Sequence, residues 1–270
     1  MSSPSLTVAV WTGSWLSGHA AADDVIDALL EWAPMHLVAA HDEDAAAAAG
    51  LRGTRPVDGA AGLLTAIRRA DPAGGAGLRL VLPAAGDVHG LPVGTEFATA
   101  ALAAGEGVLA GAPGTQGLGL VPTVEGPDVL HWKVFALPML PEPPTPPGLG
   151  EAEFTMKEAV RDAAATLTKI QTVDTNGRHA DPRAAIAEQI AEYARHRYPG
   201  VLPPRAVRIL ESADQVAAIL TVASAGEGLQ AGSASAAAAR EDALRPLWSA
   251  VRLARLGAVA ATLGALDRHR

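Results

Sequence analysis

Apolar positions in the first half of the chain follow two alternating patterns. Three short, mainly apolar runs with β-branched residues are interpreted as buried strands, at residues 6–11, 35–40 and 78–82. Three stretches with apolar side chains at helical spacing are predicted to be helices, at residues 20–32, 59–70 and 94–110. Because strands and helices alternate, we expect an α/β fold with three layers and a mostly parallel sheet.

Two further apolar runs follow at residues 118–124 and 129–137, with the turn sequence EGPD between them. Two strands joined by so short a polar turn are typical of an antiparallel hairpin. We therefore expect this hairpin to be appended to the parallel core.

Residues 138–150 contain six prolines, which remove backbone donors and favour extended chain. We interpret this segment as a Pro-rich linker or a strap between an acidic α/β domain, residues 1–137, and a helical domain, residues 151–270. After the linker the apolar periodicity is helical throughout. Four or five helices of this length predict a small all-α bundle.

The amino-acid composition limits the cellular compartment and the kinds of partner that we expect for this chain. The chain has no cysteine, which excludes disulfides, thiolate metal sites and a cysteine nucleophile. The first 22 residues contain no Lys or Arg, and the apolar stretch 256–266 is shorter than the ~20 residues that cross a bilayer. We therefore expect a cytoplasmic protein without a membrane partner.

Charge is divided unequally between the halves. Residues 1–147 contain 6 Lys and Arg against 15 Asp and Glu, a net −9, whereas residues 148–270 contain 15 against 14, a net +1. An acidic half repels polyphosphate, so we expect no nucleic-acid partner.

The motif search finds no phosphate loop, dinucleotide fingerprint, nucleophile elbow or zinc-protease motif. One weaker arrangement remains, because the loops after the first and third predicted strands would be neighbours if the strand order reversed there. Their candidate catalytic residues are Ser14, His19, Asp87 and His89, with Ser17 beside them. Such a crevice predicts a hydrolase or a small-anion site. The alternative is that Ser17 caps a helix, Asp87 holds a turn and His89 is exposed.

Two other groups of side chains have competing interpretations. A metal site would need His19, His41, Asp42, Asp87 and His89, but no pair has the spacing of helical ligands, and we expect no metal and no cofactor. Within roughly 80° on the last predicted helix lie three arginines, Arg245, Arg252 and Arg255. They are candidate partner-binding residues, or they form an ordinary solvated stripe.

Three longer stretches are distinctive together: LRLVLPAAGDVHGLPVGTEFATAALAAGEGVL, LPPRAVRILESADQVAAIL and ALRPLWSAVRLA, which begin at Leu78, Leu202 and Ala243. They resemble an uncharacterised family of conserved actinobacterial proteins. The resemblance implies that the two halves belong together as one unit, but it carries no activity or site residue to this chain.

The absence of catalytic motifs and the Ala-rich amphipathic helices favour a non-catalytic function. We expect an intracellular interaction or regulatory protein whose helical half binds an unknown partner or a second copy. The hydrolase or anion-binding crevice is the alternative.

Overall fold

The computed structural model describes residues 3–72, 77–145, 148–170, 182–225 and 234–268. The chain forms two compact units. The first, here called the α/β unit, comprises Ser2–Thr145, His196–Pro203 and Val259–Arg270, and the second, the helical unit, comprises Pro146–Arg195 and Pro204–Ala258. Two short segments from the second half of the chain thus belong to the same unit as the first half. No change in amino-acid composition marks the limits of these segments.

The α/β unit contains a mixed six-stranded sheet in the order β2-β1-β6-β5-β4-β3. Its strands are β1 (Met35–Ala40), β2 (Val57–Asp58), β3 (Leu78–Val81), β4 (Gly107–Ala110), β5 (Gly117–Val124) and β6 (Val129–Leu137). Only β1 and β6 pair in parallel, and the other four pairs are antiparallel. The α/β class is right, but the mostly parallel sheet is wrong. Short turns connect β4, β5 and β6, and such turns produce antiparallel neighbours.

The first predicted strand is wrong, because residues 6–11 lie inside helix α1 (Pro4–Leu16). A continuous apolar run does not distinguish a buried strand from a buried helix. The deciding signal is Ser3 followed by Pro4. The Ser3 hydroxyl accepts a hydrogen bond from the Leu6 N–H at 3.3 Å, and proline suits the first turn of a helix.

The predicted helix 94–110 is two elements. Helix α5 (Glu96–Ala104) ends at Gly105, whose φ of 74° is the left-handed conformation that closes helices. After Glu106, residues Gly107–Ala110 form the fully buried strand β4. The predicted helices at 20–32 and 59–70 are confirmed as α2 (Ala22–Leu30) and α4 (Ala60–Ala70). The hairpin of β5 and β6 is confirmed too, but at the centre of the sheet.

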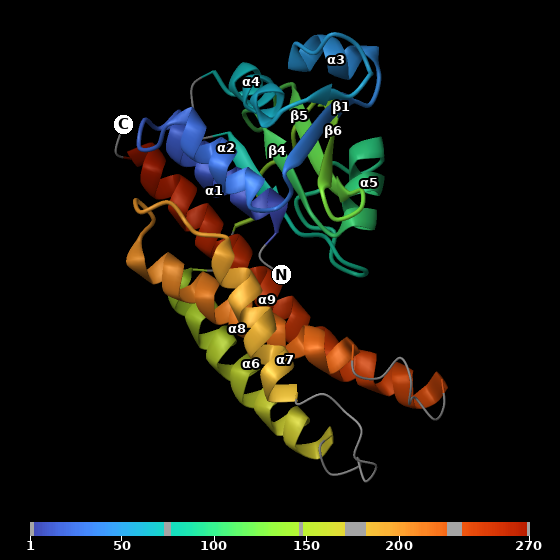
Figure 1. Cartoon of the computed structure of the whole chain (residues 1–270), viewed down its shortest axis with the longest axis vertical. Coiled ribbons are helices and arrows are strands. Elements are labelled where there is room, and N and C mark those ends of the chain that lie inside the picture. Colours follow the sequence, from blue (N-terminus) through green and yellow to red (C-terminus); the bar gives the residue numbers. More distant parts are fainter. Residues whose placement is uncertain (1–2, 73–76, 146–147, 171–181, 226–233, 269–270) are drawn as a thin grey trace. The chain divides into compact units, whose positions relative to one another are not determined.

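Helices pack on both faces of this sheet (Figure 1). On one face Phe97 of α5 lies so close to Gly119 of β5 that a Cβ at Gly119 would be 2.3 Å from the Phe97 ring. Phe135 contacts the same ring edge-on, with centroids 5.9 Å apart. On the other face lies Trp132, which is fully buried. Helix α3 (Glu43–Ala49) packs on β1 and β6 through its alanines.

The start of the Pro-rich segment lies along the α/β unit. Leu140 is buried in the core beside Phe97 and Phe135. Its N–H donates to the Thr115 carbonyl at 2.8 Å, and its own carbonyl accepts from the Gly114 N–H at 2.9 Å. Residues 138–145 therefore act as a strap rather than as a free linker.

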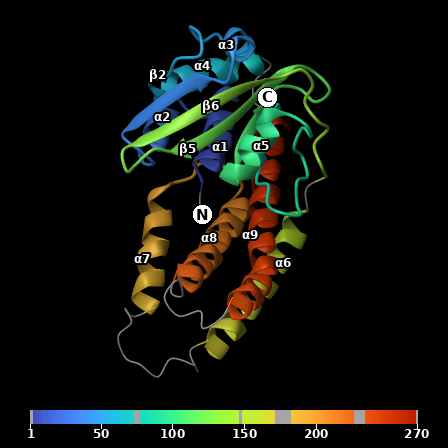
Figure 2. The same ribbon diagram turned by 90° about the vertical axis from the view of Figure 1, so that its right-hand side faces the viewer.

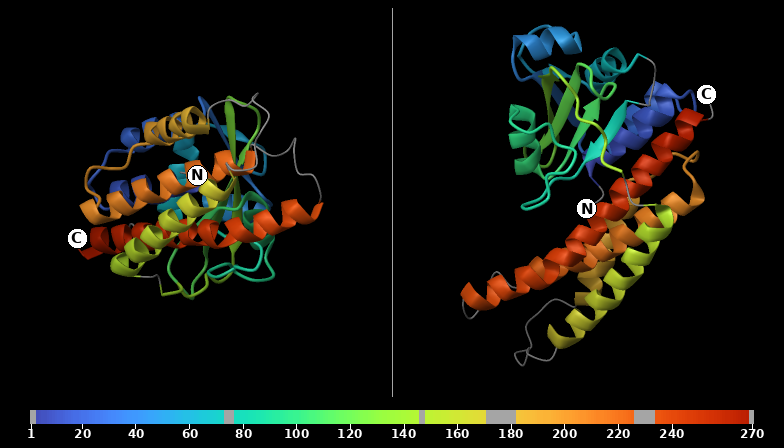
Figure 3. Two further views of the ribbon diagram at one scale, coloured as in Figure 1. Left: turned by 90° about the horizontal axis from the view of Figure 1, so that it is seen from below. Right: turned by 180° about the vertical axis from the view of Figure 1, so that it is seen from behind.

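The helical unit is built from α6 (Leu149–Ile170), α7 (Pro182–Arg195), α8 (Pro204–Ala225) and the first part of α9 (Ala234–Arg268). Helix α8 packs against both α6 and α7 (Figures 2 and 3). Its buried positions recur at helical spacing: Ala206, Ile209, Leu210, Ala213, Val216, Ala217 and Leu220. The second half of the chain is thus helical, as predicted.

One helix among the described residues is long and apolar enough to cross a membrane. Leu244–Arg268 in α9 has a mean hydropathy of 1.3 over the best window, and 56% of that window is buried in the structure. The sequence reading missed this segment because it considered only the run 256–266. Buried core helices meet the same criterion.

Candidate functional site

The serines of the predicted crevice lie in or at the end of a helix. Ser14 is fully buried in α1, where its hydroxyl donates to the Val10 carbonyl at 2.8 Å. Ser17 ends α1, and its hydroxyl donates to the Gly13 carbonyl at 2.8 Å. Gly13 packs so closely on α9 that a Cβ there would be 2.4 Å from Leu263 Cδ2. These groups stabilise helix packing rather than line a loop.

The direction of α1 separates Ser14 from the loop after β3. The Ser5 N–H at the start of α1 donates to Glu106 Oε2 at 2.8 Å. Glu106 directly precedes β4, whose first residue pairs with Val81 at the end of β3. The start of α1 therefore lies beside the end of β3. Ser14 is about 14 Å further along the helix, and exposed His19 follows it.

Asp87 and His89 meet each other within one turn. His89 Nδ1 lies 2.8 Å from Asp87 Oδ1, and the His89 side chain is 84% exposed. The backbones of Ala84 and Asp87 exchange two hydrogen bonds of 2.9 Å, which close the turn. A turn-forming Asp and an exposed His match the non-catalytic alternative. Among the residues that the structure describes, no group of three or more His, Asp or Glu side chains could hold a metal ion.

The three candidate arginines of α9 have different environments. Arg255 is buried, and its Nη2 donates to Asp214 Oδ1 of α8 at 2.5 Å. Arg252 is half-buried and donates to Ser249 Oγ at 3.0 Å. Arg245 is exposed. The three therefore do not form one exposed stripe, and Arg255 holds two helices of the same unit together.

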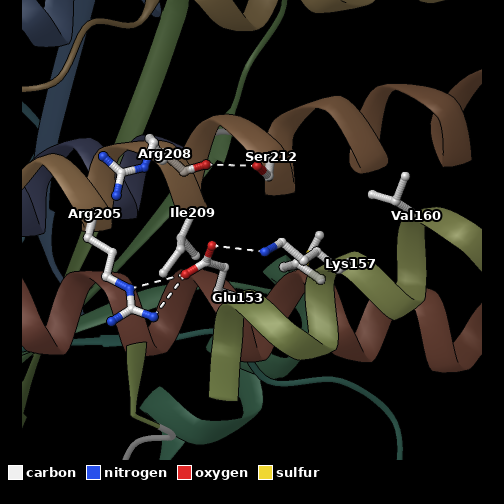
Figure 4. Close-up of a pocket in the computed structure, with 8 residues that line it drawn as sticks. Glu153, Lys157, Val160, Arg205, Arg208, Ile209 and Ser212 are labelled. Carbon is white, nitrogen blue, oxygen red and sulfur yellow. Dashed lines mark hydrogen bonds and ion pairs between the residues drawn. The ribbon is translucent and has the colours of Figure 1, made fainter. Parts of the chain in front are cut away.

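A groove lies between α6 and α8 of the helical unit (Figure 4). It has a volume of about 260 Å³. Each helix contributes four residues at positions i, i+3, i+4 and i+7, which fall on one helix face. The lining residues are Glu153, Met156, Lys157 and Val160 of α6 and Arg205, Arg208, Ile209 and Ser212 of α8.

The floor of the groove is apolar. Met156 and Ile209 are each only 2% exposed, because their helices also bury these positions in the core of the unit. Val160 is 43% exposed and extends the apolar surface along α6. An apolar floor with an open side is the form of a site that accepts an apolar side chain.

The rim of the groove is an ionic network. Arg205 donates to Glu153 Oε2 from Nε at 3.1 Å and from Nη2 at 2.9 Å. Lys157 Nζ lies 3.2 Å from Glu153 Oε1, one helical turn along α6. The hydrogen bonds from Arg205, and then those from Lys157, hold the pKa of Glu153 below its usual value. Glu153 therefore stays ionised at neutral pH.

The groove carries an excess of positive charge. Three cationic side chains surround one carboxylate, which gives a formal net charge of +2. Within the described part of the chain, no carboxylate pairs with Arg208. The hydroxyl of Ser212 donates to the Arg208 carbonyl at 2.8 Å, so it is a helix-bound group and not an activated nucleophile. These groups can bind an acidic, partly apolar ligand.

Sequence reasoning missed this groove. It recognised the helical periodicity of the residues after the linker but did not examine the charges beside the apolar positions. The available signal was a pair of cations, Arg205 and Arg208, at i and i+3 next to inward-facing Ile209. That signal becomes specific only when α6 supplies the opposite wall, which helix periodicity alone does not reveal.

Comparison with known proteins places the whole chain in a family. Residues 5–149 match the model of the Rv1486c-like protein N-terminal domain, and residues 150–256 match that of the C-terminal domain. The uncharacterized protein MT1533 of Mycobacterium tuberculosis is 39% identical, and it aligns over 96% of this chain and 97% of its own length. The uncharacterized proteins ML1804 of Mycobacterium leprae and MAV321 of Mycobacterium avium are 37% and 35% identical with the same coverage. No solved structure matches the chain. The chain therefore belongs to the Rv1486c-like protein family, as its resemblance to an uncharacterised actinobacterial family indicates.

Proposed function

We propose that this chain is a non-catalytic interaction protein whose groove between α6 and α8 binds an acidic amphipathic helix of a partner protein. The observation that carries the proposal is the pairing of two helix faces, each with the i, i+3, i+4, i+7 spacing, around the apolar floor of Met156 and Ile209. Grooves between helices commonly accept the apolar face of a further helix.

The charge of the rim defines the kind of partner. Because Lys157, Arg205 and Arg208 exceed the single carboxylate Glu153, an acidic helix is attracted and a basic helix is repelled. The apolar floor adds a requirement for Leu, Ile or Met on the same face of the partner. An exposed ionic rim contributes more to selectivity and association rate than to affinity.

The size of the groove limits the strength of binding. A volume of about 260 Å³ accommodates only one or two large side chains. Burial of each contributes about 1.5–3 kcal/mol, from which the cost of association is subtracted. We therefore expect a transient complex, with a Kd on the order of a millimolar or somewhat below.

We further propose that α6, α7, α8 and the first part of α9 form a four-helix bundle that holds the groove rigid. The contacts of α8 with α6 and α7 and the Arg255–Asp214 pair between α9 and α8 support this arrangement. A rigid groove loses little entropy when the partner binds.

Photo-crosslinking in the native host tests the proposed function. A photoreactive amino acid at Val160 lies in the groove, and the same amino acid at Phe154 lies on the same helix, 65% exposed but outside the groove lining. We expect crosslinks from position 160, to a peptide rich in Asp or Glu around apolar residues, and none from position 154. Arg208→Glu should abolish the crosslink.

Equal crosslinking from both positions would show that α6 is merely exposed, and it would contradict the proposal. Crosslinks to a basic or neutral peptide, or crosslinks that survive Arg208→Glu, would contradict the acidic partner. Crosslinks to the acidic segments of a second copy of this chain would instead identify the occupant as a homodimer partner, and they would overturn binding of a different protein.

A further inference from the structure

The carboxylate of Glu153 lies between two cationic side chains of the groove. It is the single carboxylate among the eight lining residues, and its two oxygens bind two different cations. Oε2 accepts two hydrogen bonds from Arg205 of α8, and Oε1 lies 3.2 Å from Lys157 of α6. Figure 4 shows the Glu153 carboxylate between these two side chains. A partner's carboxylate that binds Arg205 or Lys157 would compete with Glu153 for these donors.

We propose that Glu153 is an internal competitor, which holds Arg205 and Lys157 until a carboxylate of the partner replaces it. This inference rests on the function proposed above and adds a regulatory contact to that site. In the unoccupied groove, Glu153 is paired with Arg205 and Lys157. An acidic helix breaks these ion pairs as it binds.

The exposure of the three side chains makes this exchange feasible. The side chains of Glu153, Lys157 and Arg205 are 36%, 70% and 48% exposed. Water reaches all three, so each charge remains solvated while one carboxylate leaves and another arrives. A buried pair would not exchange in this way, because an unpaired buried charge is costly.

Arg208 supplies the first contact in this scheme. It lies one helical turn after Arg205, and no carboxylate pairs with it in the described part of the chain. A partner with one acidic residue can bind Arg208 and leave the Glu153 network intact. A partner with two acidic residues one turn apart can bind Arg208 and also replace Glu153 on Arg205. Glu153 therefore selects for the spacing of charge on the partner helix.

The test uses the full chain and a fluorescent synthetic helix of about 18 residues, made of Ala and Leu with Glu at i and i+3 beside the Leu stripe. Fluorescence anisotropy at low salt gives the Kd for the wild type and for Glu153→Gln, which keeps the shape of the side chain but removes its charge. We expect Glu153→Gln to bind about 2- to 5-fold more tightly, and the gain to shrink as salt is added.

Matched controls on the same helix correct for general charge effects. Glu158 pairs with Arg161 at 2.5 Å and lies outside the groove lining. Glu158→Gln makes the same change in net charge, and we expect it to leave the Kd within about 1.5-fold of the wild type. A second peptide with a single Glu should bind Glu153→Gln and wild type almost equally, because it does not reach Arg205.

The possible results separate the two proposals. If Glu153→Gln and Glu158→Gln tighten binding equally, the effect is net charge alone and the internal competitor is refuted. If Arg208→Gln weakens binding but Glu153→Gln changes nothing, the groove binds an acidic helix and only the competitor is refuted. If neither wild type nor Glu153→Gln binds the two-Glu peptide up to millimolar concentration, both proposals fail.

Discussion

The two units contain polar groups with opposite degrees of exposure. In the α/β unit, His36 is buried and both of its ring nitrogens are bound within the fold. His36 accepts a hydrogen bond from Trp132 Nε1 at 3.0 Å, so its other nitrogen carries the proton and donates to the Leu29 carbonyl at 2.9 Å. In the helical unit an ionic network around Glu153 lies at the exposed rim of a groove.

This difference distinguishes polar groups that stabilise the fold from polar groups that can bind a ligand. Both ring nitrogens of His36 are engaged in the fold, so this side chain has no capacity left for a ligand. Exposed groups around an apolar floor can exchange partners. The helical unit contains both kinds, because the side chains of Arg255 and Asp214 are 6% and 13% exposed while those of Arg205 and Glu153 are 48% and 36% exposed. Comparing such pairs tests the distinction directly.

Breaking the buried pair should have the largest effect. Asp214→Ala leaves the Arg255 guanidinium, only 6% exposed, without its carboxylate. We expect the free energy of unfolding of the helical unit to fall by about 3–5 kcal/mol. Urea denaturation followed by circular dichroism measures this loss.

The control for that prediction replaces both partners with apolar residues. Asp214→Leu combined with Arg255→Met removes both charges, and we expect it to recover most of the stability that Asp214→Ala loses. A double variant no more stable than Asp214→Ala would mean that packing, and not an unpaired charge, explains the loss.

The tight core of the α/β unit predicts the next largest effect. In Gly119→Ala the new Cβ would lie 2.3 Å from Phe97 Cδ2, and Phe97 is fully buried. The ring must move, which should cost about 1–3 kcal/mol of unfolding free energy. Phe97→Leu in the same chain should relieve part of this cost, whereas additive losses would contradict the clash.

Local signals explain which parts of the fold were predictable. Residues 35–40 are a short, mainly apolar run between Pro34 and His41, and β1 has those same limits. Residues 6–11 contain more β-branched side chains, two Val and one Thr, yet Ser3 and Pro4 begin a helix there. The N-terminal capping signal outweighs β propensity when the helix is buried on nearly all sides, as α1 is.

Non-local pairing explains the rest. Because residues 6–11 were predicted to be a strand, Ser14 was expected in the loop after it, beside Asp87. These residues instead belong to α1, so the predicted crevice does not form. The parallel sheet was inferred from the order of elements, but the register of β6 beside β1 depends on contacts 94 residues apart in sequence, such as Met35 with Val129. The groove likewise depends on α6 meeting α8, with Glu153 and Arg205 52 residues apart.

The buried imidazole of the α/β unit predicts a pH dependence. Burial lowers the pKa of His36 below its ordinary value of 6.5. The unfolded chain therefore binds a proton at a higher pH than the folded protein does. Stability from His36 is present above pH 6.5 and is lost as the pH falls from 6.5 toward the lowered folded pKa.

The fluorescence of the five tryptophans, Trp132 among them, during urea unfolding at pH 5 to 8 measures this dependence. His36→Gln can still accept from Trp132 and donate to the Leu29 carbonyl, but it does not titrate. Subtracting its curve from that of the wild type isolates His36 from the other histidines. We expect a difference that grows as the pH falls below 6.5, and two parallel curves would contradict the prediction.

The smallest effect is expected for the exposed pair of Glu158 and Arg161 on α6, whose side chains are 43% and 70% exposed. A double-mutant cycle with Glu158→Gln and Arg161→Gln should give a coupling of about 0.3–0.5 kcal/mol that disappears at high salt. Since this geometry, 2.5 Å between Arg161 Nη1 and Glu158 Oε1, is as close as that of Arg255 and Asp214, the two pairs differ mainly in exposure. Equal couplings would show that distance and not burial sets the strength of ionic contacts in this unit. The Glu153 network would then resist displacement as strongly as the buried pair.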